Sequence, residues 1–107
     1  MIDIDLIRRY IRTRYVVVER RPSSSYYSYV LHLIDLDRQE QIDCENYGDM
    51  SYWEQPNEEK SFDEAYNELL KRNNIDDKDI TFISYSDDNV PFELWYELVA
   101  IIFKQSY

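Results

Sequence analysis

The sequence has 107 residues, of which 44% are hydrophobic and 16% aromatic, and its formal net charge at pH 7 is -10. This length predicts a single domain, 1–107, with a modest core. So high an aromatic content argues against a disordered chain. The negative charge argues against direct binding to nucleic acid or to an anionic membrane, since both would repel it, and it favours a basic partner.

The chain offers few of the residues that enzymes and metal centres need. Its single cysteine, Cys44, allows neither an internal disulfide nor a cysteine-based zinc site. We expect a cytoplasmic protein, because the cysteine content is low and the sequence shows neither a signal peptide nor an apolar run long enough to span a membrane. Its single glycine, Gly48, is too little for a loop that binds phosphates or a dinucleotide. His32 is the only histidine, and the sequence around it supports neither a Ser-His-Asp nor a Cys-His catalytic arrangement. We therefore expect no enzyme, no cofactor and no metal site.

The first half of the chain predicts one helix followed by three strands. Ile4, Ile7 and Ile11 fall at helical spacing, and they predict a helix from about Ile4 to Thr13. β-branched and alternating apolar residues then predict strands at 15–19, 26–36 and 40–44. A Pro-Ser loop and a short polar turn separate these strands, which is typical of an antiparallel meander.

The second half predicts a polar loop, a helix, a short strand and a final helix. Residues 45–60 are polar and predict the loop, and Ser61 to Glu64 form a capping box that begins a helix ending at 71–74. A short strand is expected at 80–85 and a last helix from about Val90 to Lys104, whose apolar side, including Phe92, should pack across the sheet. The predicted fold is α+β, an antiparallel three- to four-stranded sheet packed in two layers against helices, in the order α-β-β-β-α-β-α.

The negative charge is concentrated in one part of the chain. Residues 1–38 contain seven Lys or Arg and five Asp or Glu, a net charge of +2, whereas residues 39–107 contain five and seventeen, a net charge of -12. Like charges this close destabilise the free fold, and a basic partner that neutralises them would remove that cost. The hypothesis of such a partner requires that folding gathers the acidic side chains into one continuous stripe. A solvated surface of capping and turn residues is the competing interpretation. The candidate partner-binding residues are Asp37, Glu40, Asp43, Glu45, Asp76, Asp77, Asp79, Asp87 and Asp88.

Over about the first 43 residues, the chain resembles a known family. Asp5-Leu6-Ile7-Arg8, then Tyr15 and Val17, and then a turn with Asp37 and Glu40 follow the same helix-and-meander order as the small acidic anti-CRISPR proteins of Listeria prophages.

That resemblance implies a DNA mimic that occupies the basic groove of the type II RNA-guided nuclease, and Asp37 and Glu40 match two acidic contact positions of the family. Arg14 departs from the pattern, because the family carries an acid there. The later part of the chain does not align, so Asp76, Asp77 and Asp79 are only an analogue of the family's later acidic cluster.

Three functions remain open from the sequence. The first is an acidic DNA-mimic inhibitor that binds the basic nucleic-acid-binding groove of a CRISPR-associated nuclease, or of another DNA-acting host enzyme, and blocks its DNA binding. The second is an immunity protein that neutralises a basic toxin nuclease; prophage genes nearby favour the first, and a toxin gene directly upstream favours the second. The third is an interaction module with an apolar patch around Tyr26, Tyr27 and Trp53, whose association would not depend on salt.

Overall fold

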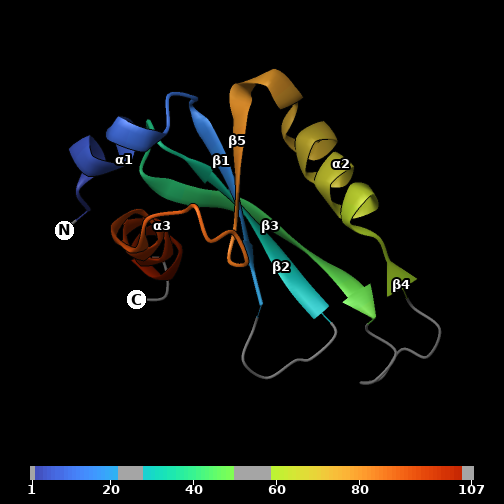
Figure 1. Cartoon of the computed structure of the whole chain (residues 1–107). Helices are drawn as coiled ribbons and strands as arrows, with labels where there is room; N and C mark the ends of the chain where they lie inside the picture. Colours follow the sequence, from blue (N-terminus) through green and yellow to red (C-terminus); the bar gives the residue numbers. More distant parts are fainter. Residues whose placement is uncertain (1, 22–27, 50–58, 105–107) are drawn as a thin grey trace.

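A computed structural model describes residues 2–21, 28–49 and 59–104. These residues form a five-stranded sheet with the strand order β4-β3-β2-β1-β5 and three α-helices (Figure 1). The helices are α1 (Ile4–Tyr10), α2 (Phe62–Asn73) and α3 (Phe92–Lys104), with a 3-10 helix η1 (Asp77–Asp79). The strands are β1 (Tyr15–Arg20), β2 (Ser28–Asp35), β3 (Glu40–Asp49), β4 (Glu59–Lys60) and β5 (Ile80–Ser84).

The α+β class and the order α-β-β-β-α-β-α are confirmed, with the two-residue β4 as an addition. The prediction of a wholly antiparallel sheet is wrong, because β5 pairs parallel to β1, with Val17 opposite Phe82. Since β3 runs antiparallel to β2, α2 must carry the chain back along the sheet before β5 begins. The chain therefore enters β5 at the same end of the sheet as β1, and the two strands run in the same direction.

The antiparallel meander of β1, β2 and β3 is confirmed, but its third strand is longer than predicted. β3 continues to Asp49, so the loop expected at 45–60 is wrong over 45–49, and residues 50–58 lie outside the described part of the chain. Tyr47 pairs with Tyr29 of β2, and their rings stack with centroids 5.0 Å apart. Such a cross-strand aromatic pair stabilises a strand that carries polar residues around it.

The helix ends follow local chemistry. α1 stops at Tyr10 rather than Thr13, because Ile11 is extended and buries its side chain in the core. α2 begins where the capping box predicts, with the Ser61 hydroxyl oxygen accepting a hydrogen bond from the Glu64 N–H at 3.1 Å. It ends at Asn74, whose backbone is left-handed at φ 55°, a conformation that asparagine tolerates.

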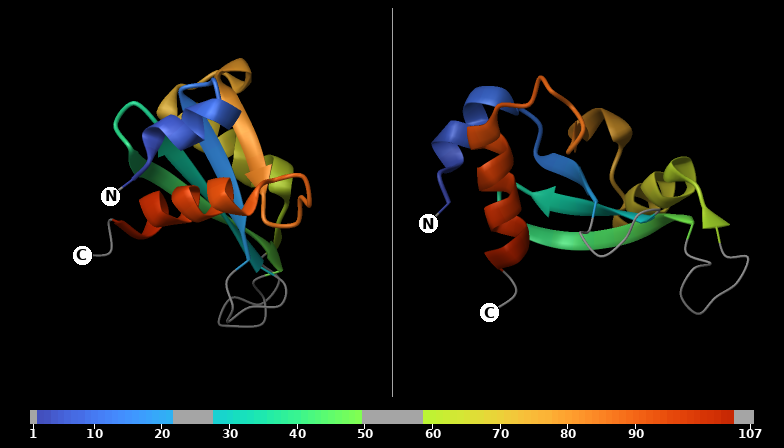
Figure 2. Two further views of the ribbon diagram at one scale, coloured as in Figure 1. Left: turned by 60° about the vertical axis from the view of Figure 1, so that its left-hand side comes forward. Right: turned by 60° about the horizontal axis from the view of Figure 1, so that its bottom comes forward.

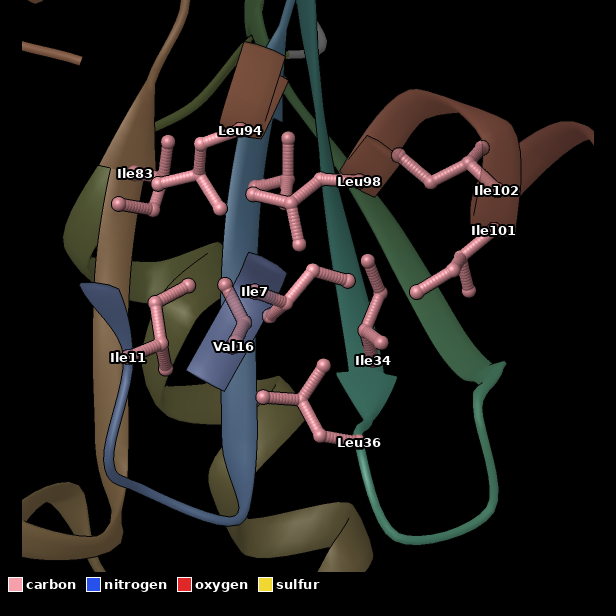
Figure 3. Packing of buried hydrophobic residues seen from close by; sticks show 11 residues of the cluster. Ile7, Ile11, Val16, Ile34, Leu36, Ile83, Leu94, Leu98, Ile101 and Ile102 are labelled. Carbon is pink, nitrogen blue, oxygen red and sulfur yellow. The ribbon is translucent and has the colours of Figure 1, made fainter. Parts of the chain in front are cut away.

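Helices cover both faces of the sheet, so the prediction of two layers is wrong. Val16 and Val18 of β1 pack with α1 and α3, whereas Val17 between them packs with α2, and all three side chains are fully buried. Figure 2 shows α1 and α3 together on one part of the sheet and α2 on another. Figure 3 shows the buried hydrophobic side chains that pack between the sheet and the helices α1 and α3. None of the helices in the described residues is long and apolar enough to span a bilayer.

Candidate functional site

A buried carboxylate that the sequence analysis did not single out lies at the end of β2. Asp35 is 2% exposed, and Arg14 Nε and Nη2 donate hydrogen bonds to its two oxygens at 3.2 and 3.0 Å. The Asp37 N–H donates to the same carboxylate at 3.0 Å. Burial acts to raise the pKa of Asp35, but these hydrogen bonds and the Arg14 charge outweigh it and lower the pKa. The signal in the sequence is an aspartate directly before a polar turn, where its side chain can bind turn N–H groups.

The two acidic positions that the resemblance implies as nuclease contacts already have cationic partners within this chain. Arg8 Nη2 lies 3.0 Å from Asp37 Oδ1, and Arg14 Nε lies 3.5 Å from Asp37 Oδ2. Glu40 forms an ion pair with Arg38. An arginine of a partner must therefore compete with an intramolecular ion pair at either carboxylate.

Asp43 and Glu45 project from β3 toward α2. Arg72 of α2 donates two hydrogen bonds to Asp43, at 2.9 and 3.0 Å, and one to Glu45 at 2.8 Å. Lys60 Nζ lies 3.2 Å from Glu45. Burial acts to raise the pKa of each carboxyl group, but hydrogen bonds lower both values: those from Arg72 and Asn73 lower the pKa of Asp43, and those from Arg72 and Lys60 lower the pKa of Glu45. These two carboxylates therefore bind α2 to β3 of the sheet through hydrogen bonds from Arg72.

Asp76, Asp77 and Asp79 lie at the start of β5 and are exposed. Asp76 caps η1 by accepting a hydrogen bond from the Lys78 N–H at 3.2 Å, and Asp77 accepts one from the Tyr66 hydroxyl at 2.6 Å. Burial and this hydrogen bond raise the pKa of Tyr66. Among the residues that the structure describes, none of the three forms an ion pair with Lys or Arg.

Asp87 and Asp88 lie at the other end of β5, in the connection to α3, and are also exposed. Asp87 accepts a hydrogen bond from the Asn89 N–H at 2.9 Å, and neither carboxylate has an ion pair within the described ranges. Both residues line a pocket of about 280 Å³, which we call the β5–α3 pocket. Its other lining residues are Ser84, Tyr85, Val90, Phe92 and Trp95.

The nine candidate carboxylates are therefore not gathered into the expected continuous stripe. Four of them, on the β2–β3 hairpin and on β3, are bound by Arg or Lys of the same chain. The other five lie beyond the two ends of β5, whose five residues separate the two groups by about 16 Å. We call these five residues, 76, 77, 79, 87 and 88, the β5 carboxylates. Among the nine candidates, these five alone have no ion pair with Lys or Arg in the described residues.

The exposed aromatic side chains differ from those expected. Phe92 is 78% exposed, although the sequence placed it on the packed side of the last helix. At about 3.6 residues per turn, Phe92 lies on the opposite side of α3 from Leu94 and Ile101, which supply core contacts of that helix. Tyr26, Tyr27 and Trp53, the proposed apolar patch, lie outside the described residues.

The described part of the chain contains no group of three or more His, Cys, Asp and Glu side chains that could hold a metal ion. His32 is buried, and Arg20 Nε donates a hydrogen bond to its Nε2 at 3.3 Å, so this imidazole belongs to the packing of the sheet. No family model, curated protein or solved structure matches this chain.

Proposed function

We propose that this protein is an acidic inhibitor that acts in the cytoplasm of a bacterial host. It binds the basic nucleic-acid-binding groove of a DNA-acting enzyme and blocks DNA binding there. The leading candidate for this enzyme is a type II CRISPR-associated nuclease. One observation carries the proposal: the five β5 carboxylates are exposed, and none has a cationic partner in the described chain.

The mechanism is competition for arginine and lysine side chains. A DNA-binding groove holds phosphates by charge-assisted hydrogen bonds, and a carboxylate accepts the same bonds from the same donors. Asp76, Asp77 and Asp79 repel one another in the unbound protein, and a basic groove relieves that repulsion. Asp37 and Glu40 contribute less than the resemblance implies, because Arg8, Arg14 and Arg38 already neutralise them.

The test is inhibition of DNA cleavage by a guide-loaded type II nuclease, with increasing amounts of this protein at low and at high salt. We expect inhibition that weakens with added salt. The double variants Asp77→Asn with Asp79→Asn and Asp87→Asn with Asp88→Asn should each raise the half-inhibitory concentration about ten-fold, because interfacial charge pairs are lost.

The matched control is Asp37→Asn with Glu40→Gln, which removes the same two charges from positions that have intramolecular partners. Its half-inhibitory concentration should stay within about two-fold of that of the unmodified protein, because arginines of the same chain already neutralise these two carboxylates. Unhindered cleavage at a large molar excess of the protein contradicts the proposed target. An equal loss in the control shows that net charge, and not the β5 carboxylates, carries the inhibition.

A further inference from the structure

β5 is an edge strand, and every second residue directs its backbone groups away from the sheet. β5 pairs with β1 alone, and the Tyr85 N–H donates to the Glu19 carbonyl oxygen at 3.1 Å. In a parallel pair, the backbone groups of alternate residues point to the same side. Those of Ile80, Phe82 and Ser84 therefore point outward, and we call them the β5 edge.

Two of the outward groups are satisfied locally. The Ile80 N–H donates to the Asp77 carbonyl oxygen, and the Ser84 carbonyl oxygen accepts from the Asp87 N–H at 3.1 Å. The Ile80 carbonyl, both backbone groups of Phe82 and the Ser84 N–H have no backbone partner in the described residues. Such a row of donors and acceptors is a template for one more strand.

The β5–α3 pocket adds a binding place for a cationic side chain next to this edge. Ser84, the last residue of β5, lines it together with the carboxylates of Asp87 and Asp88. The rings of Tyr85 and Phe92, which also line it, are 40% and 78% exposed. Carboxylates form charge-assisted hydrogen bonds with Lys and Arg, and aromatic faces attract the same cations.

We propose that the β5 edge binds an extended basic segment of the protein partner as a sixth strand, with one Lys or Arg side chain in the β5–α3 pocket. The basic character of the occupant rests on the proposed function and on the β5 carboxylates at both ends of the strand. A second copy of this chain does not fit, because pairing two β5 edges would bring the same acidic groups against each other.

A short synthetic peptide of alternating arginine and valine is the probe. Its charge-matched control is the same peptide with N-methyl groups on alternate backbone nitrogens, which removes the donors of one edge. We expect the first peptide to bind and to slow hydrogen exchange at the Phe82 and Ser84 amides. The methylated peptide should bind at least about ten-fold more weakly, because backbone hydrogen bonds supply the affinity of an added strand.

On the protein side, Asp87→Asn with Asp88→Asn should weaken binding of the unmodified peptide several-fold, whereas Asp37→Asn with Glu40→Gln should not. Equal binding of the two peptides, or unchanged exchange at both amides, overturns the strand pairing. Nuclease inhibition that persists in that case leaves the acidic mechanism standing without an added strand. Peptide pairing without nuclease inhibition supports the β5 edge and contradicts only the proposed target.

Discussion

On the β2–β3 side of the sheet, Asp35, Asp43 and Glu45 accept hydrogen bonds from Arg14, Arg72 and Lys60, whereas the β5 carboxylates have no such partners in the described chain. The first group is partly or fully buried and joins elements that are distant in sequence, namely the β2–β3 turn to the start of β1 and α2 to β3. The second group is exposed and forms no ion pair in the described residues, although Asp77 accepts a hydrogen bond from the Tyr66 hydroxyl of α2. The difference shows that one acidic composition serves two purposes, stabilising the fold on one side and presenting charge on the other.

The largest effect on stability should come from removing the cation that neutralises Asp35. Arg14→Met leaves a carboxylate with only 3% side-chain exposure without its partner. We expect a loss of about 2 kcal/mol in the free energy of unfolding, below the range for a fully buried pair because Arg14 is half-exposed. Urea denaturation measures it.

Arg12→Met is the control for that variant. It makes the same chemical change in an exposed arginine of the same segment. Its effect should stay below about 0.5 kcal/mol, as for an ordinary surface substitution. Equal losses in the two variants would show that the Arg14–Asp35 pair does not stabilise the fold.

A smaller effect should appear in the pH dependence of stability. The pKa values of Asp43 and Glu45 are lowered in the folded protein, so the unfolded chain binds protons first as the pH falls. The stability that these groups supply is thus complete above about pH 5 and is lost as the pH falls through their lowered values.

Asp43→Asn with Glu45→Gln should cost about 1 kcal/mol at pH 7, because two charged acceptors of Arg72 become neutral. The variant should also lose less stability than the unmodified protein between about pH 5 and pH 3. Denaturant melts at several pH values test this. An unchanged slope would mean that these carboxylates do not stabilise the folded state.

The smallest effect on stability is expected at the β5 carboxylates. Asp77→Asn with Asp79→Asn should change the free energy of unfolding by less than about 0.5 kcal/mol at moderate salt. At low salt it should raise stability slightly, because repulsion among neighbouring acids is removed. Thermal melts at two salt concentrations measure both. A clear loss of stability at either salt concentration would show that these residues stabilise the fold as Asp35, Asp43 and Glu45 do. The two groups of carboxylates would then not differ in their role.

Local signals in the sequence were sufficient for most elements of the fold. The Ser61 capping box, the β-branched run at Tyr15 and the short turn after β2 each act within a few residues, and each produced the expected element. The exposed position of Phe92 was not predictable in this way. α3 is apolar around most of its circumference, so helical spacing alone did not show which side packs into the core. The structure buries Leu94 and Ile101, and Phe92 lies on the opposite side of the helix.

The sequence by itself determined the α+β elements, their order, the Ser61 cap of α2 and the excess of negative charge in residues 39–107. The tertiary structure alone decided the parallel placement of β5 and which carboxylates are neutralised. Asp43 meets Arg72 across 29 residues of chain, and Asp35 meets Arg14 across 21. Propensity and periodicity act over a few residues, whereas charge pairing depends on distance in space. Which carboxylates remain available to a partner could therefore be identified only from the folded structure, in which the other candidates form ion pairs with Arg or Lys of the same chain.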